Sequence, residues 1–389
     1  MSIPAPTRQA ALEHLKSFTP KAGRQYASTR NHDHGAGSWS NVSTLSPHVR
    51  HRLVLEEELA AVALSAHSPA AAEKFVQEVF WRTYWKGWLE RRPAVWDRYK
   101  AERDRDFDTL ETSGGLEKAY ASAIAGQTGI DCFDHWATEL VETGYLHNHA
   151  RMWFASIWIF TLKLPWALGA DFFLRHLMDG DAASNTLSWR WVAGLQTLGK
   201  TYLARASNIE SYTGGRFSPD PGQLASEAPA LVGEPHPSAA LAPLSDPMPD
   251  APYALFLHED DSCFEALALG SAPATIIVQQ GAVPRGPQPL GSPARGFTEA
   301  ALNNAAARAG RAFEVEVVRA VPDSVRDVGG GLPIVCARVP AGPLRDALGR
   351  CALTQLVRPV DAYFWPHADK GFFKLKKAIP GAIEQFAWY

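Results

Sequence analysis

A proline-rich stretch divides this 389-residue sequence into two parts of different character. Nine prolines lie within residues 218–252, and the stretch has no regular apolar spacing. Proline lacks a backbone N–H and fixes φ, so such a stretch forms neither a continuous helix nor a central strand. We therefore predict a linker over residues 217–252, between a first domain over residues 1–216 and a second over residues 253–389.

The two parts have different apolar patterns. Before the linker, apolar residues recur at helical intervals, for example over residues 75–92 and 132–163, which predicts a mostly helical domain. After the linker, short apolar runs predict buried strands, and two longer segments between them predict helices. The predicted strands are 253–258, 274–280, 313–318 and 332–339, and the predicted helices are 297–310 and 342–350. This alternation predicts a small α/β domain with a largely parallel sheet.

Charge and cysteine usage exclude several classes of protein. The formal net charge is −3, so overall basicity does not indicate a nucleic-acid binder or a membrane-surface binder. The four cysteines form no Cys-x-x-Cys pair, which argues against a zinc site, a cysteine-ligated iron–sulfur cluster and a disulfide framework. The apolar run over residues 152–164 is too short and too interrupted to span a bilayer. We expect a cytoplasmic protein without a metal site or a membrane contact.

A tryptophan-rich helix face begins within the sequence QEVFWR at residues 77–82. Glu78, Trp81, Trp85 and Trp88 are spaced by three, four and three residues, so they share one face. A carboxylate among indoles is unusual in a plain core, because an unpaired buried charge costs several kcal/mol or becomes protonated. The alternative is an amphipathic helix whose tryptophans pack inward and whose Glu78 pairs with Arg82.

Two further stretches place polar side chains one helical turn apart. In TGYLHNHARM, residues 143–152, Asn148 and Arg151 can reach the same ligand, although a satisfied polar pair in the core is the simpler alternative. In DGDAASNTLSWRWVAG, residues 179–194, Asp181 and Asn185 face the same way. A carboxylate accepts a ring N–H and an amide donates or accepts, so this pair can contact two atoms of one planar heteroaromatic ring.

Together with STLSP at residues 43–47, these stretches resemble the FAD-binding domain of the cryptochrome/photolyase family. The resemblance runs from about Tyr26 to Phe217. It implies a helical FAD-binding domain of photolyase type, without the N-terminal antenna domain that is usual in the family. The small α/β domain after the linker has no role that the resemblance explains.

The resemblance implies a set of cofactor-binding residues. Tyr26 and residues 43–46 would hold the FAD pyrophosphate, and Ser46 with Pro47 has the composition of a helix N-cap and first turn. An Arg151–Asp179 ion pair would lie beside the isoalloxazine, with Asn185 near its N5. The complete set is Tyr26, Ser43, Thr44, Leu45, Ser46, Glu78, Arg82, Asn148, Arg151, Asp179, Asp181 and Asn185.

The resemblance also implies residues that act in catalysis. Trp189 would be the tryptophan nearest the flavin in an electron-transfer chain and Trp166 the middle one. The surface tryptophan of that chain is replaced by Ala123, and the candidates for its role are Tyr120, Trp136, Trp153 and Trp158. Glu78 and Trp81 would face a lesion pocket, and Trp191 would stack on a flipped-out pyrimidine dimer. The catalytic set is Glu78, Trp81, Trp166, Asn185, Trp189 and Trp191.

Three functions are consistent with these residues. The first is blue-light-driven repair of pyrimidine dimers in UV-damaged DNA, a deoxyribodipyrimidine photolyase (lyase) activity in which reduced flavin donates an electron to the dimer. The second is a cryptochrome-like receptor or redox flavoprotein with a signalling partner, which is favoured by the missing antenna domain, the altered electron-transfer chain, the acidic charge balance and the added C-terminal domain. His149 stands where many dimer-repair relatives have arginine, which weakens the case for a DNA substrate. The third is a binding module for DNA or protein. The basic residues of 91–105 would form either a phosphate-binding rim or a solvated helix face.

Overall fold

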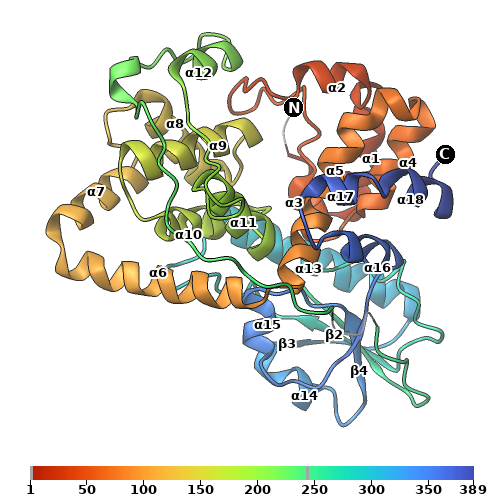
Figure 1. The fold of residues 1–389 in the computed structure, drawn as a ribbon. Helices are drawn as coiled ribbons and strands as arrows, with labels where there is room; N and C mark the ends of the chain where they lie inside the picture. Colours follow the sequence, from red (N-terminus) through yellow and green to blue (C-terminus); the bar gives the residue numbers. More distant parts are fainter. Residues whose placement is uncertain (1–2, 242–244) are drawn as a thin grey trace.

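The computed structural model describes residues 3–241 and 245–389, and helices form most of it before residue 213 (Figure 1). Residues 1–2 of the predicted first domain and 242–244 of the predicted linker lie outside the described residues. The helices are α1 (Arg8–Phe18), α2 (Arg24–Thr29), α3 (Ser46–Arg50), α4 (Glu56–Ala66), α5 (Pro69–Glu90), α6 (Ala94–Thr112), α7 (Gly114–Ile124), α8 (Asp131–Thr143), α9 (Asn148–Ser156), α10 (Trp166–His176), α11 (Ala182–Val192) and α12 (Ala206–Tyr212), with short turns η1 (Thr19–Lys21) and η2 (Ile157–Thr161). The predicted helical domain is confirmed.

Helix α5 is the central element of this helical half. It begins at Pro69 after Ser68, whose side chain accepts a hydrogen bond from Ala71 N, and its 22 residues pack against α4, α11 and α2. Trp85 and Trp88 are buried on its predicted tryptophan face. Within residues 3–241 and 245–389, no helix is long and apolar enough to cross a membrane.

The second half contains a five-stranded parallel sheet in the order β3-β2-β1-β4-β5. Its strands are β1 (Ala254–Leu257), β2 (Thr275–Gln279), β3 (Val317–Ala320), β4 (Ile334–Ala337) and β5 (Thr354–Leu356), and its helices are α13 (Ser292–Phe313), α14 (Val325–Val328) and α15 (Pro343–Leu348), with η4 (Pro322–Ser324). Leu255 and Leu257 of β1 pack with α13, whereas Ala254 and Phe256 pack with α14 and α15. Side chains alternate between the two faces of a strand, so helices cover both faces of the sheet.

The predicted parallel sheet is confirmed, with two differences. The strand predicted at residues 313–318 begins later, because α13 continues to Phe313 and ends at Glu314, which has a left-handed φ of 53°. Strand β5 was not among the predicted strands. It is only three residues long and half-buried at the sheet edge, so its apolar run is too short to predict a strand from the sequence.

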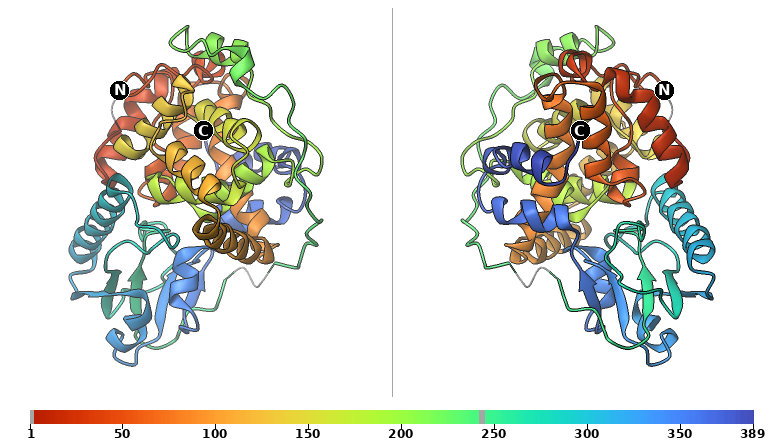
Figure 2. Two further views of the ribbon diagram at one scale, coloured as in Figure 1. Left: turned by 90° about the vertical axis from the view of Figure 1, so that its left-hand side faces the viewer. Right: turned by 90° about the vertical axis from the view of Figure 1, so that its right-hand side faces the viewer.

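The segment between the two halves lies extended along the outside of the helical half, as the views in Figure 2 show in green. Its regular structure in the described parts is the short turn η3 (Pro221–Gln223). Two backbone hydrogen bonds attach it to the helices, from Leu231 N to Ala193 O and from Ala239 N to Arg91 O.

After β5 the chain returns to the helical half. Helices α16 (Pro359–Phe364) and α17 (Phe372–Lys376), with η5 (Trp365–His367), pack against α5, and α18 (Ile379–Gln385) follows them (Figure 1). The ring of Phe364 lies 4.6 Å from that of Phe80, and the ring of Phe372 stacks on Trp81 at 3.8 Å between centroids. A Cβ on Gly87 would lie 2.7 Å from Trp365, so only glycine allows this close approach. The last thirty residues therefore belong to the core of the helical half.

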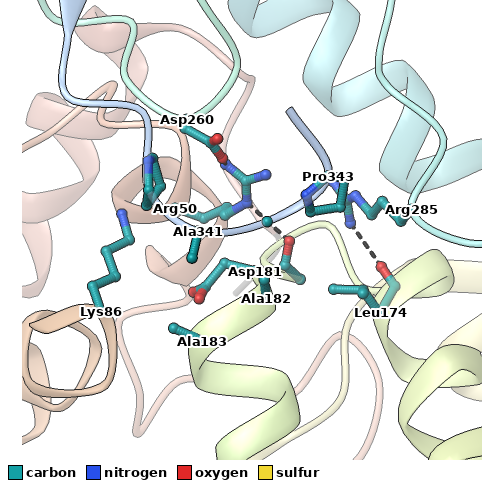
Figure 3. A pocket seen from close by; sticks show the side chains of 13 residues that line it. Arg50, Lys86, Leu174, Asp181, Ala182, Ala183, Asp260, Arg285, Ala341 and Pro343 are labelled. Carbon is teal, nitrogen blue, oxygen red and sulfur yellow. Dashed lines mark hydrogen bonds and ion pairs between the residues drawn. The ribbon is translucent and has the colours of Figure 1, made fainter. Parts of the chain in front are cut away.

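The sheet meets the helical half through the carboxyl ends of its strands. Arg50, at the end of α3, pairs with Asp260 after β1 at 2.6 Å, and Figure 3 shows the two side chains pointing at each other. Lys86 and Arg285 lie around the same contact, which encloses a cavity of about 10 Å³. Ligands of doubly wound sheets usually bind at this edge, where the strand order reverses between β1 and β4. Here the helical half fills it and leaves room for about one water molecule.

Candidate cofactor site

A cavity of about 540 Å³ lies within the helical half, between α2, α5, α9 and α11 and the loop before α3. Every site residue predicted from the sequence lines it, except Trp166. The cavity has the size of a small-molecule or cofactor site, which typically measures about 300–1,000 Å³.

Two aspartates and two arginines form an ion-pair cluster in one wall. Asp179 contacts Arg151 at 3.0 Å, which is the expected ion pair, and Arg82 at 3.8 Å. Arg82 also pairs with Asp181. Burial alone would raise the pKa of Asp179, but Arg151 and Arg82 outweigh burial and lower it, so this carboxylate is ionised at neutral pH.

Helix α11 begins directly after this cluster. Asp181 is its N-cap and accepts a hydrogen bond from Ser184 N at 2.8 Å. One turn later the side-chain NH₂ of Asn185 donates one N–H to Ala170 O at 2.8 Å, which leaves its carbonyl oxygen and its second N–H for a ligand. Asn148, the first residue of α9, lines the same cavity.

Glu78 has a different partner from the one that its helix spacing suggests. Its carboxylate lies 3.5 Å from the guanidinium of Arg30, on α2's C-terminal side, whereas Arg82 turns to the aspartates. The alternative of a Glu78–Arg82 pair is therefore wrong. Burial raises the pKa of Glu78 and Arg30 only partly opposes it, so this carboxyl group holds a proton more readily than a solvated glutamate.

The loop before α3 borders the opposite wall. Thr44 has a left-handed φ of 53°, and His14 Nε2 lies 2.8 Å from the carbonyl of Ser43. The N-cap is Leu45, and Ser46 is the first residue of α3, so the prediction of a Ser46 cap is wrong by one position. Thr44 is left-handed, and the helix begins two residues later, so Ser46 is already its first residue. Tyr26 faces the cavity from α2 and packs against Phe75.

The tryptophans differ in exposure. Trp189 is buried at the cavity wall, whereas Trp191 lines the cavity with 36% of its surface exposed and stacks on Tyr202. Trp81 has Phe372 on its other face. Trp166 lies away from the cavity, where its Nε1 donates to Glu102 at 2.8 Å and its ring contacts Tyr99.

Sequence reasoning missed two lining residues that shape the charge of the site. Arg30 pairs with Glu78, and Tyr145 lies under the guanidinium of Arg151, 5.6 Å from its ring centre. Tyr145 lies inside the TGYLHNHARM stretch, but the stretch by itself does not predict its contact with Arg151. No sequence spacing connects Arg30 with Glu78.

Three of the six basic residues in 91–105 form ion pairs within the protein. Arg98 pairs with Glu234, Lys100 with Asp346, and Arg103 with Asp104. Their charges are therefore partly neutralised, which favours a structural helix face over a phosphate-binding rim.

Comparison with known proteins connects this site to a family. Residues 75–219 match the family model described as FAD binding domain of DNA photolyase. This stretch is therefore similar to the FAD-binding domain of photolyases. A deoxyribodipyrimidine photo-lyase of Streptomyces griseus is 37% identical over 170 residues, 43% of this chain and 34% of the relative. One of Thermus thermophilus is 32% identical over 195 residues, 50% of this chain and 44% of the relative.

Among solved structures, a bacterial class III photolyase from Agrobacterium tumefaciens is 27% identical, with a TM-score of 0.46, over 55% of this chain and 44% of that one. This chain spans less than half the length of the deoxyribodipyrimidine photo-lyases of Streptomyces griseus and Thermus thermophilus.

The polar atoms of the photolyase-type domain fit FAD. Among the described residues, Ser184 Oγ and Trp189 Nε1 are buried without a hydrogen-bond partner, although both residues line the cavity. Buried polar groups are rarely left unpaired, so a polar ligand is expected beside them. Two aspartates, an asparagine and two arginines offer acceptors and donors for a flavin ring and for phosphates.

Proposed function

We propose that this protein is an FAD-dependent enzyme that repairs pyrimidine dimers in UV-damaged DNA, driven by blue light. The observation that carries the proposal is a single cavity. Glu78, Trp81 and Trp191 open onto the same space as the Asp179–Asp181–Arg82–Arg151 cluster, so a lesion and a flavin can lie in contact.

In this proposal the ion-pair cluster and Asn185 hold the isoalloxazine, and Tyr26 with residues 43–46 holds the pyrophosphate. Arg151 keeps Asp179 ionised, and the N-cap interaction of Asp181 fixes its carboxylate in place. The rigidity of these groups orients the cofactor, as is usual for preorganised sites. Residues 1–216 would bind the cofactor, and residues 253–389 would support that half.

Bound reduced FAD supplies the light-excited electron that splits the dimer. The chain supplies the lesion pocket. Trp191 and Trp81 offer aromatic faces for a flipped-out base, and stacking on such faces offsets the cost of leaving the duplex. Glu78, which binds a proton readily, would donate a hydrogen bond to a pyrimidine carbonyl on which negative charge develops.

The cellular setting is proposed to be the cytoplasm. All four cysteines are free, and Cys132, Cys263 and Cys336 are buried, which is consistent with a reducing compartment.

The test is the loss of dimers from a UV-irradiated oligonucleotide under blue light, with FAD fully reduced and with a dark control. We expect light-dependent loss in the wild type and a lower yield in Glu78→Gln with unchanged FAD content. Bound FAD without any dimer loss would refute repair and indicate the receptor or redox flavoprotein instead. Purified protein that contains no FAD and binds none when it is added would refute both.

A further inference from the structure

A continuous row of aromatic rings leads from the cofactor cavity to the inner face of α7. Trp189 lines the cavity, and its ring meets Trp158 edge-to-face with centroids 6.2 Å apart. Trp158 meets Tyr120 in the same manner at 6.0 Å. Adjacent rings in contact are efficient steps for electron hopping.

Gly169 makes the first of these contacts possible. A Cβ at this position would lie 2.3 Å from Trp189 and 2.9 Å from Trp158, which no side chain could occupy. Gly169 lies inside α10, where glycine costs about 1 kcal/mol relative to alanine. The absence of a side chain here allows α10 to pass the point where the two indoles meet.

The middle tryptophan expected from the family pattern lies on another path. Trp166 contacts Tyr99 at 5.7 Å, and in the parts of the chain that the structure describes no ring contact joins it to Trp189. The guanidinium of Arg190 lies 5.9 Å over its ring, which disfavours a positive charge there, while the hydrogen-bonded Glu102 partly compensates. Trp158 therefore has the better contact with Trp189.

The position of Tyr120 suits the outer end of the row. Ala123, which replaces the surface tryptophan, is fully buried, and Tyr120 lies one turn earlier on the same face of α7. Tyr120 retains 8% exposure on a helix at the edge of the molecule (Figure 1). Trp158 is fully buried and its Nε1 donates to Pro165 O at 2.9 Å, so it has no route for losing a proton to water.

We propose that Tyr120 is the terminal electron donor of this protein, and that Trp158 takes the place of Trp166 in the path to Trp189. When oxidised FAD is photoexcited, one electron passes from Trp189 to it. Trp158 then donates an electron to the oxidised Trp189, and Tyr120 donates an electron to the oxidised Trp158. Tyr120 releases its phenolic proton to water and becomes a neutral tyrosyl radical, so one electron enters the flavin and one proton leaves the protein. This inference rests on the proposed FAD site and is independent of DNA repair.

The test compares Tyr120→Phe and Trp158→Phe with the matched control Trp166→Phe, each with its FAD content measured. After a laser flash on oxidised protein, transient absorption and electron paramagnetic resonance identify the radical formed. We expect a tyrosyl radical in the wild type and in Trp166→Phe, its loss in Tyr120→Phe, and loss of photoreduction in Trp158→Phe. If Trp158→Phe fails to fold, Tyr120→Phe decides, because it removes only one hydroxyl.

Loss of photoreduction in Trp166→Phe but not in Trp158→Phe, or an unchanged radical in Tyr120→Phe, would overturn the inference. Wild-type protein without FAD would instead contradict the proposed function.

Discussion

Asp261 lies between two guanidinium groups that come from opposite ends of the chain. Its carboxylate contacts Arg52 at 3.0 Å and Arg358 at 2.6 Å, and all three side chains are buried. Burial alone would raise the pKa of Asp261, but Arg358 and Arg52 together hold it far below the usual range. Such a network contributes stability only while every charge keeps its partner.

We expect Asp261→Asn to destabilise the protein by about 3–5 kcal/mol at pH 7, since it leaves the buried Arg358 without its counter-charge and removes one of the carboxylates around Arg52, which keeps Glu56 and Asp361. A carboxyl group with a lowered folded-state pKa contributes stability above its unfolded pKa of about 3.9 and loses it as the pH falls further. The difference between wild type and variant should therefore shrink below about pH 4. Urea unfolding from pH 3 to pH 8 measures it.

The control for this measurement is Asp369→Asn, which breaks a more exposed pair with Lys374 and should cost about 0–1 kcal/mol. A loss of similar size in both variants would contradict the role given to the buried network.

Trp191 is the residue whose exposure permits contact with a base. We expect Trp191→Ala to weaken binding to dimer-containing DNA by roughly 1–3 kcal/mol, the usual value of base–aromatic stacking. Fluorescence anisotropy measures this, with the exposed Leu198→Ala as the control. Equal weakening on damaged and undamaged strands would mean that Trp191 contacts DNA without recognising the lesion.

At the scale of the element, the helical period of α11 places its cofactor-facing residues on one face and Trp191 on another. Asp181, Asn185 and Trp189 are four residues apart and share a face toward the cavity, whereas Trp191 lies off that face and reaches solvent. One helix thus presents polar groups and an electron carrier to the cofactor, and an indole to the part of the cavity that is open to solvent.

Asp181 both caps this helix and pairs with Arg82, and two substitutions separate these roles. Asparagine is as good an N-cap as aspartate, so Asp181→Asn should keep helix stability, while Asp181→Ala should lose about 1 kcal/mol. Both remove the charge beside Arg82, so we expect FAD affinity to fall by about tenfold or more in each, equivalent to about 1.4 kcal/mol. Thermal unfolding of the apo-protein and FAD titration measure the two effects. Full FAD affinity in Asp181→Asn would show that the charge is unnecessary.

At the scale of the molecule, three kinds of contact hold the halves together besides the linker. They are the ion pairs at the carboxyl edge of the sheet, the apolar packing of α13 against the helical half, and the return of residues 359–389 to α5. Phe364, Phe372 and Leu375 are buried in the same core as Phe80 and Trp85. The extended segment between the halves is hydrogen-bonded to both of them, for example from Leu231 N to Ala193 O and from Asp246 N to Gln355 O.

We therefore expect that cutting the linker will not separate the halves. A protease site inserted between Ser226 and Glu227, which are exposed, should be cleaved without loss of FAD. Size-exclusion chromatography of the cleaved protein should give one peak that contains both fragments, matched against the uncut protein with the same insertion. Release of a separate N-terminal fragment would contradict the shared core.

The sequence by itself determined what local spacing encodes. The period of apolar residues predicted the helical half and the parallel sheet, and the stretches QEVFWR, TGYLHNHARM and DGDAASN, together with the family resemblance, named polar residues that line the cavity. These features depend on residues within a few turns of one another, where helix geometry fixes the distances.

Only the tertiary structure decided the contacts between distant segments. It pairs Glu78 with Arg30 instead of Arg82, brings residues 359–389 back to α5, and directs Trp189 to Trp158 across Gly169. The helix period predicts which face of a helix a side chain occupies, but it does not predict which element packs against that face. The partner is chosen by packing and by the pairing of buried charges, which depend on the whole fold.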